Sequence, residues 1–200
     1  MMMKILVTSI KGGVGKSSIA SSLAAYLDSL YVTNDLISGN DGDENQIEPN
    51  RKRIPQVYSR LQNVVYDFGA MYSQLDSKIA HAADLCDVFV IPTLTDVRSL
   101  KGAIQTYELL KAKNKPIVFI INNFTSEKKF NNAAQTLLKH LGEVPIIAIR
   151  KTMLFERFAE HGKSWLANIH NEYGEWQLSR SKKQHDKIYD AIVRIGEGKR

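Results

Sequence analysis

The chain has 200 residues, of which 44% are hydrophobic and 24% are charged, and its formal net charge is +6. These values are typical of a globular chain long enough for one domain with a sizeable core, and they exclude a disordered or fibrous protein. The single cysteine, Cys86, excludes an internal disulfide, and runs such as VFVI and IVFII are too short to cross a bilayer. The N-terminus lacks the pattern of a signal peptide. We therefore expect one cytoplasmic domain over residues 1–200.

Short β-branched runs alternate with helical patterns along the chain, which is typical of βαβ units. The predicted strands cover residues 4–9, 31–35, 63–68, 87–92, 116–122 and 144–149. Apolar residues at helical spacing predict helices from about Lys16 to Leu30, over 100–110, 130–141 and 152–160, and again over 184–195. This order predicts an α/β fold, a doubly wound and mostly parallel sheet flanked by helices.

Residues 36–57 are the one long stretch without periodicity, and such stretches inside compact domains are usually functional or mobile. Their acidic residues do not match a calcium-binding loop. When Gly42 takes the invariant glycine position of such a loop, Ile37 falls where the first carboxylate must be.

The octapeptide KGGVGKSS, residues 11–18, follows the first predicted strand and opens the first predicted helix. Glycines let the backbone wrap around anionic oxygens, and the helix N-terminus adds partial positive charge. In this context Lys16 can reach the β- and γ-phosphates of a nucleotide, and the Ser17 hydroxyl can bind Mg²⁺. The residues expected to bind the nucleotide here are Gly12, Gly13, Val14, Gly15, Lys16, Ser17 and Ser18.

Lys11 departs from the usual phosphate-loop pattern, which has a glycine at the position of Ile10. Because Lys11 precedes the turn, its side chain is poorly placed to reach the γ-phosphate of its own loop. KGGVGKSS resembles the deviant Walker A box of the ParA/MinD superfamily of P-loop ATPases. The resemblance implies that Lys11 crosses the interface of an ATP-sandwiched homodimer and contacts the partner's phosphates. The alternative is a solvated surface lysine.

The resemblance continues beyond this box and covers about residues 3 to 165. VVYDFGAM, AADLCDVFVIP and EHGKSW are similar to later elements of the family, although only the first box is diagnostic. The short distance between the second and third strands, and the lack of room for an N-terminal helix-turn-helix domain, resemble the short ParA branch of plasmid partition proteins.

Asp67 ends the apolar strand segment VVYD, at the carboxyl edge where parallel sheets bind ligands. We assign it a Walker-B-like role, bonding to magnesium waters; the alternative is a turn residue at a strand end. The family's second strand commonly ends in Asp-x-Asp-Pro, and its second aspartate orients the hydrolytic water. Asp35 matches that residue, although Thr33 replaces the first aspartate, and Asp41 and Asp43 are the substitutes. The resemblance thus implies Lys11, Lys16 and Asp35 as the catalytic set.

Asn122 and Asn123 follow the fifth predicted strand, at the place where the family contacts adenine. An amide can both donate to and accept from the edge of a base. We assign Asn122 to nucleotide binding; a helix cap or turn role is the alternative.

Residues 179–200 hold seven basic and three acidic residues. Arg180, Lys182, Lys183 and Lys187 are the residues expected to bind DNA phosphates without reading sequence. The alternative for each, as for 51–53 (RKR), is a solubilising role. A MinD-like membrane helix at this end is disfavoured because Asp186 and Asp190 would meet an anionic membrane.

The phosphate loop predicts nucleotide binding, and the resemblance implies a Mg²⁺-dependent, slow ATPase that dimerises around ATP and binds DNA non-specifically. The resemblance implies a nucleoid-associated role in plasmid or chromosome partition with a ParB-like centromere-binding protein. The alternatives are a MinD-like ATPase that positions a protein or membrane cargo, a DNA-binding scaffold without turnover, and a small-molecule kinase. Lys11 and the lack of an arginine-rich lid argue against the kinase.

Overall fold

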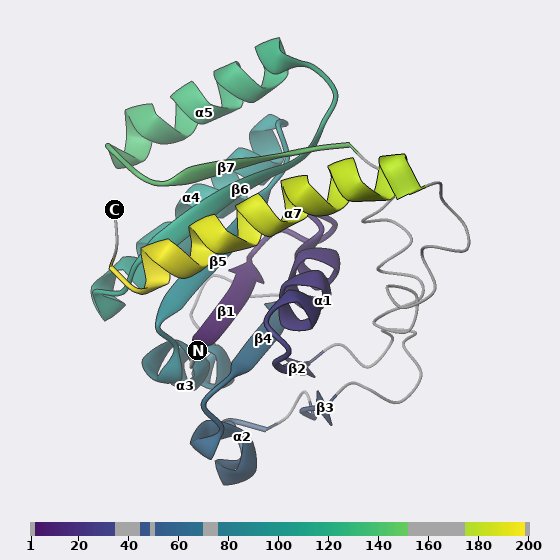
Figure 1. Cartoon of the computed structure of the whole chain (residues 1–200). Helices are drawn as coiled ribbons and strands as arrows, with labels where there is room; N and C mark the ends of the chain where they lie inside the picture. Colours follow the sequence, from purple (N-terminus) through teal and green to yellow (C-terminus); the bar gives the residue numbers. More distant parts are fainter. Residues whose placement is uncertain (1–2, 35–44, 49–50, 70–75, 152–174, 199–200) are drawn as a thin grey trace.

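A computed structural model of the chain describes residues 3–34, 45–48, 51–69, 76–151 and 175–198, without the side chains of residues 45 and 175–184. Figure 1 shows a central sheet with helices on both of its faces. Every strand pair in this sheet is parallel. The predicted α/β class with a doubly wound, parallel sheet is therefore confirmed.

Seven strands form the sheet in the order β3-β2-β4-β1-β5-β6-β7. Their bounds are β1 (Lys4–Ser9), β2 (Leu30–Thr33), β3 (Asn45–Gln46), β4 (Val64–Gly69), β5 (Val88–Thr93), β6 (Ile117–Phe124) and β7 (Ile146–Arg150). Strand β1 lies between β4 and β5, so the chain leaves the centre of the sheet in one direction and later returns to build the other half.

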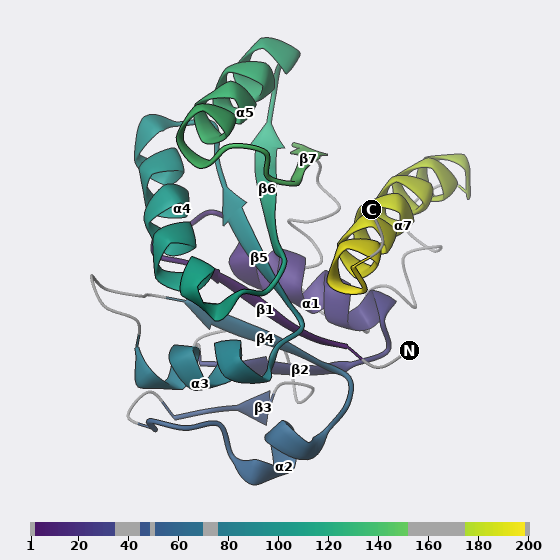
Figure 2. The ribbon, with the colours of Figure 1, turned by 90° about the vertical axis from the view of Figure 1, so that its left-hand side faces the viewer.

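The helices form two layers, one on each face of the sheet (Figure 2). Their bounds are α1 (Lys16–Tyr26), α2 (Gln56–Arg60), α3 (Ser77–Leu85), α4 (Val97–Leu110), the short 3-10 helix η1 (Lys111–Lys113), α5 (Glu127–Leu141) and α7 (Glu175–Gly196). Helices α1 and α7 pack on one face, and α3, α4 and α5 pack on the other. No helix in the described ranges combines the length and the apolar character needed to span a membrane.

Both faces of the sheet are buried, which explains why the strands are continuous apolar runs. In β1, Ile5 and Val7 pack toward α1 and α7, while Leu6 packs toward the other helical layer. Cys86 lies in that second layer and is fully buried, and burial raises the pKa of its thiol. The thiol is thus held protonated, as expected for a structural cysteine.

Helix α1 is shorter than the apolar pattern predicts. It ends at Tyr26, with Leu27 as its C-cap, and Leu30 already belongs to β2. The chain turns at Asp28, which adopts a positive φ of 46°, and the Leu30 N–H then donates to the Asn63 carbonyl at the start of β4. The prediction failed because apolar residues of the next strand continue the helical spacing by chance.

The aperiodic stretch 36–57 contains a strand that the sequence does not predict. Strand β3 pairs with β2 through Asn45 and Gln46, and the neighbouring Ile47 is buried and donates its N–H to the Thr33 carbonyl. Two residues are too few to show a period, so only the contact with β2 reveals this strand.

The C-terminal helix α7 begins at Glu175, nine residues before the predicted start at 184, whereas the predicted helix over 152–160 lies outside the described residues. Helix α7 docks on α1 through a polar cluster. The Tyr189 and Ser22 hydroxyls share a hydrogen bond, and the Tyr26 hydroxyl donates to Asp190 at 2.5 Å. His185 meets the Tyr189 ring edge-on at 5.8 Å.

Burial of His185 against this cluster predicts acid-sensitive stability. Burial lowers the pKa of His185 from 6.5 to about 4, so the fold favours the neutral ring. The stabilisation from burying the neutral ring is complete above pH 6.5, the pKa of histidine in the unfolded chain. As the pH falls toward 4, the free energy of unfolding decreases by on the order of 2 kcal/mol. Urea unfolding of His185→Phe should therefore show a smaller stability loss between pH 7 and about pH 4.5 than the unmodified protein. The exposed His140→Gln variant is the control, and equal losses in all three proteins would contradict this account.

Candidate nucleotide-binding site

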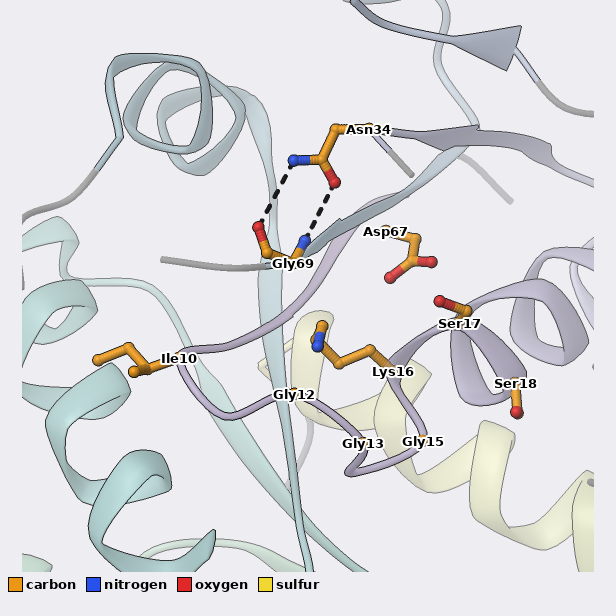
Figure 3. Close-up of a pocket in the computed structure, with 10 residues that line it drawn as sticks. All are labelled: Ile10, Gly12, Gly13, Gly15, Lys16, Ser17, Ser18, Asn34, Asp67 and Gly69. Atoms are coloured by element: carbon orange, nitrogen blue, oxygen red, sulfur yellow. Dashed lines mark hydrogen bonds between the residues drawn. The ribbon is translucent and has the colours of Figure 1, made fainter. Parts of the chain in front are cut away.

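The candidate site lies at the carboxyl edge of the sheet, where the chain leaves β1 and enters α1. This is the point at which the strand order reverses, and in open parallel sheets such points bind ligands. The connecting loop, residues 10–15, brings its backbone toward the ends of β2 and β4, as Figure 3 shows.

Two glycines give this loop its shape. Gly13 and Gly15 adopt positive φ values of 74° and 87°, a region that side chains disfavour. Gly15 is the N-cap of α1, with no side-chain cap and no acidic residue in the first turn of the helix. The positive end of the helix dipole is thus left for an anion. No atom lies within 4 Å of where a side chain would start at Gly12 or Gly13, so their backbone faces open space.

A cavity of about 560 Å³ opens in front of the loop, which is within the range of small-ligand sites. The residues that line it are Ile10, Gly12, Gly13, Gly15, Lys16, Ser17, Ser18, Asn34, Asp67 and Gly69 (Figure 3). The structure therefore brings together most of the residues that the sequence assigns to phosphate binding. Val14 is the exception, because its side chain is buried below the loop.

Lys16 lies over the end of β4, where Gly69 makes room for it. A methyl group at Gly69 would come within 2.9 Å of the Lys16 Cε atom. The Lys16 ammonium donates to the Lys11 carbonyl at 3.4 Å and lines the cavity, where it can meet phosphate oxygens. A larger residue at position 69 would therefore displace the end of the Lys16 side chain, a contact that the sequence does not reveal.

Asp67 lies across the cavity from the loop, and its carboxylate points toward the Ser17 hydroxyl (Figure 3). The Tyr31 hydroxyl donates to the Asp67 Oδ2 atom at 2.7 Å, and both side chains are buried. Carboxylate and hydroxyl oxygens suit Mg²⁺, which usually takes its other ligands from water and from substrate phosphates. The described residues contain no cluster of three or more His, Cys, Asp and Glu. Ser17 and Asp67 are thus suited to hold Mg²⁺ together with the phosphates of a nucleotide.

Asn34 lines the cavity although the sequence analysis did not single it out. It joins the ends of β2 and β4 through two hydrogen bonds with Gly69: the Gly69 N–H donates to Oδ1 at 3.1 Å, and Nδ2 donates to the Gly69 carbonyl at 3.5 Å (Figure 3). The sequence did offer one indication of this role, because Asn34 is the middle residue of the segment 33–35 that was compared with the Asp-x-Asp pattern of the family.

Asn122 lies within β6 rather than after it, and it braces the loop. Its Nδ2 atom donates to the Val14 carbonyl at 3.1 Å. It is not a helix cap, since Ser126 caps α5. Asn123 adopts a positive φ of 55° at the irregularity that separates Ile121 from Phe124 in the pairing of β6 with β7. Contact of Asn122 with a base stays a prediction.

Lys11 is exposed and does not line the cavity; its ammonium donates to the Gly12 carbonyl at 3.1 Å. Helix α4 fixes the backbone at this point. The Ile10 N–H donates to the Thr106 hydroxyl at 3.0 Å, and a methyl group at Gly102 would come within 3.0 Å of the Lys11 Cβ atom. Sequence reasoning missed Gly102 and Thr106, because they lie far along the chain.

The structure does not describe most of the remaining predicted residues. Asp35, Asp41 and Asp43 lie outside the described residues, as do the side chains of Arg180, Lys182 and Lys183 on α7. Lys187, on the same helix, is exposed.

Several solved structures have a similar fold. A ParA family ATPase from Chlorobium tepidum TLS matches with a TM-score of 0.60 and 20% identity, covering 94% of this chain and 96% of that one. The septum site-determining protein MinD from Pyrococcus horikoshii OT3, complexed with Mg-ADP, matches with a TM-score of 0.63 and 14% identity over 99% and 96% of the two chains. A putative plasmid partition protein from Borrelia burgdorferi B31, bound to AMPPNP, matches with a TM-score of 0.56 and 15% identity over 100% of both.

Comparison with curated protein sequences finds no significant match. The model of the CobQ/CobB/MinD/ParA nucleotide binding domain, in contrast, matches residues 5–165, which include the loop, Asn34, Asp67 and Asn122. All the residues that line the cavity lie inside the matched range. The chain therefore belongs to the CobQ/CobB/MinD/ParA nucleotide-binding family.

Proposed function

We propose that the protein is a ParA-like, Mg²⁺-dependent ATPase that forms an ATP-sandwich homodimer, binds DNA non-specifically and drives plasmid or chromosome partition. The observation that carries the proposal is the different position of two lysines in the loop. Lys16 lies inside the phosphate cavity, whereas Lys11 is exposed at its edge on a backbone that α4 holds in place. An exposed cation beside an anion site is suited to a phosphate held by a second copy.

Nucleotide binding in this proposal uses the loop backbone, Lys16 and the N-terminus of α1 for the phosphates. Ser17 and Asp67 hold Mg²⁺, Asp67 through water. The ion, when bound, neutralises charge on the phosphates. The AMPPNP and Mg-ADP in the structures of the similar proteins support this choice of ligand.

Hydrolysis is assigned to Asp35, which orients the attacking water, and it acts as a timer. ATP drives assembly only if the dimer binds it more tightly than the monomer does. Hydrolysis removes that difference, so the dimer separates and releases its DNA. A ParB-like centromere-binding partner stimulates this step in our proposal.

DNA binding is assigned to the cations of α7, Arg180, Lys182, Lys183 and Lys187. A dimer presents each of them twice, so up to eight phosphates are neutralised. The logarithm of the binding constant should then fall with the logarithm of salt concentration with a slope of about −7. The protein in this role is associated with the nucleoid.

The experiment is fluorescence anisotropy of labelled, random-sequence duplex DNA, titrated with protein at several salt concentrations. We expect binding with ATP and Mg²⁺, little binding with ADP, and a slope reduced by about 2 in Lys187→Ala, because each dimer loses two contacts. A parallel titration with anionic vesicles tests the MinD-like alternative. Vesicle binding without DNA binding would contradict the partition function and favour membrane cargo positioning.

A further inference from the structure

We propose that Tyr31 is a positioning residue for magnesium, because its hydroxyl fixes the orientation of the Asp67 carboxylate at the phosphate loop. The inference rests on the proposed nucleotide function for the identity of the ligand. Its structural basis is independent of that function and consists of one buried hydrogen bond between neighbouring strands.

The sheet register brings the two side chains together. Strands β2 and β4 are parallel, with Tyr31 opposite Val65 and Thr33 opposite Asp67. Tyr31 is therefore the diagonal neighbour of Asp67 on the same face of the sheet, within reach of a long side chain. Its ring packs in the core below α1, at 5% exposure, while Asp67 is 2% exposed.

The hydrogen bond has a geometry suited to a charged acceptor. The Tyr31 Oη atom lies 2.7 Å from Asp67 Oδ2, a normal length for a hydroxyl that donates to a carboxylate. Rotation about χ2 of an aspartate is broad and roughly two-fold, so an unrestrained carboxylate can exchange its two oxygens. A donor fixed on Oδ2 removes that freedom and sets the direction of the whole group.

A purely apolar side chain would serve the packing of β2 equally well at this position. Tyrosine adds a hydroxyl that must find a partner when it is buried, and here the partner is the carboxylate that lines the cavity. Removing the hydrogen-bond partner of a carboxylate that ligates a metal directly typically changes metal affinity 10- to 100-fold. Since Asp67 would hold the ion through water, we expect a change at the lower end of this range. We therefore assign the Tyr31 hydroxyl to the magnesium site as well as to the core.

The chain offers a matched control in Tyr66. It is also a fully buried tyrosine, it lies on the adjacent strand β4, and its hydroxyl donates to the Tyr58 carbonyl at 3.2 Å. Its ring packs on the opposite face of the sheet, in the layer of α3. Tyr66→Phe thus removes one partly buried hydrogen bond from the same sheet, made by a tyrosine that does not line the cavity.

The test compares Tyr31→Phe, Tyr66→Phe and the unmodified protein by titrating Mg²⁺ into complexes with a fluorescent ATP analogue. Without Mg²⁺, we expect all three to bind the analogue within about two-fold of one another, because the loop and Lys16 are intact. The Mg²⁺ concentration at half-saturation should rise about 10-fold in Tyr31→Phe and should stay unchanged in Tyr66→Phe. Thermal unfolding without Mg²⁺ should show similar small decreases in Tm for both variants.

A double-mutant cycle shows whether Tyr31 acts through Asp67. In an Asp67→Asn background, the further change Tyr31→Phe should leave the Mg²⁺ half-saturation unmoved. An unchanged half-saturation in the single variant Tyr31→Phe, with the unmodified protein binding normally, would overturn the role of Tyr31 alone. Failure of the unmodified protein to bind the analogue at all would instead overturn the proposed nucleotide function.

Discussion

Gly15→Ala is expected to weaken nucleotide binding by on the order of 100-fold, through strain and a steric clash in the same residue. Gly15 adopts a φ of 87°, and an added methyl group would lie 2.3 Å from the Asn122 Nδ2 atom. The amide would have to move and release the Val14 carbonyl that it now holds. The loop would then lose both its hydrogen bond to Asn122 and the turn that begins α1. Isothermal titration calorimetry with an ATP analogue measures the resulting decrease in nucleotide affinity.

Gly13→Ala separates strain from clash. It has comparable strain, at a φ of 74°, but no atom lies within 4 Å of its added methyl group. It should bind more tightly than Gly15→Ala and more weakly than the unmodified protein. Affinity of Gly15→Ala within a few-fold of the unmodified protein would show that the loop does not hold phosphates as described.

Lys11→Ala is expected to abolish ATP-dependent dimerisation while nucleotide binding by the monomer stays within a few-fold. Lys11 is exposed and lies outside the cavity lining, so its removal leaves the site of each copy intact. In a two-fold dimer the substitution removes two charged contacts, each worth about 1.5–3 kcal/mol, and the dimer should weaken by on the order of 100-fold or more. Sedimentation velocity with a non-hydrolysable ATP analogue measures the dimer, and equilibrium titration at low protein concentration measures the nucleotide.

The control for Lys11→Ala is Lys101→Ala. Lys101 is an exposed lysine on α4, next to Gly102, which packs against Lys11. Lys101→Ala removes one positive charge from the same region of the surface as Lys11→Ala does, but it leaves Lys11 in place. Parallel losses of nucleotide affinity and dimerisation in Lys11→Ala would mean that Lys11 acts on its own nucleotide, which contradicts the assignment to a partner's phosphates.

The sequence predicts the parts of this site that depend on local spacing. The phosphate loop is continuous in the chain, so KGGVGKSS indicates its glycines, Lys16 and Ser17 directly, and a strand-end aspartate indicates Asp67. The six predicted strands are correct to within a few residues for the same reason, since each is a run of β-branched and aromatic residues.

The parts that the sequence does not show depend on contacts between distant segments. Tyr31 meets Asp67 only through the register of β2 and β4, and Thr106 reaches the Ile10 N–H only because α4 lies beside the loop. Asn122 reaches the Val14 carbonyl only because the loop lies beside β6, and its expected contact with a base stays a prediction. No periodicity in a single sequence encodes such contacts.

The most direct test of the account is the mass of the unmodified protein in solution, measured by light scattering with ADP and with a non-hydrolysable ATP analogue and Mg²⁺. The account predicts one copy with ADP and two copies with the analogue. A single copy in both states, with the analogue demonstrably bound, would contradict the ATP-sandwich dimer on which the proposed function depends.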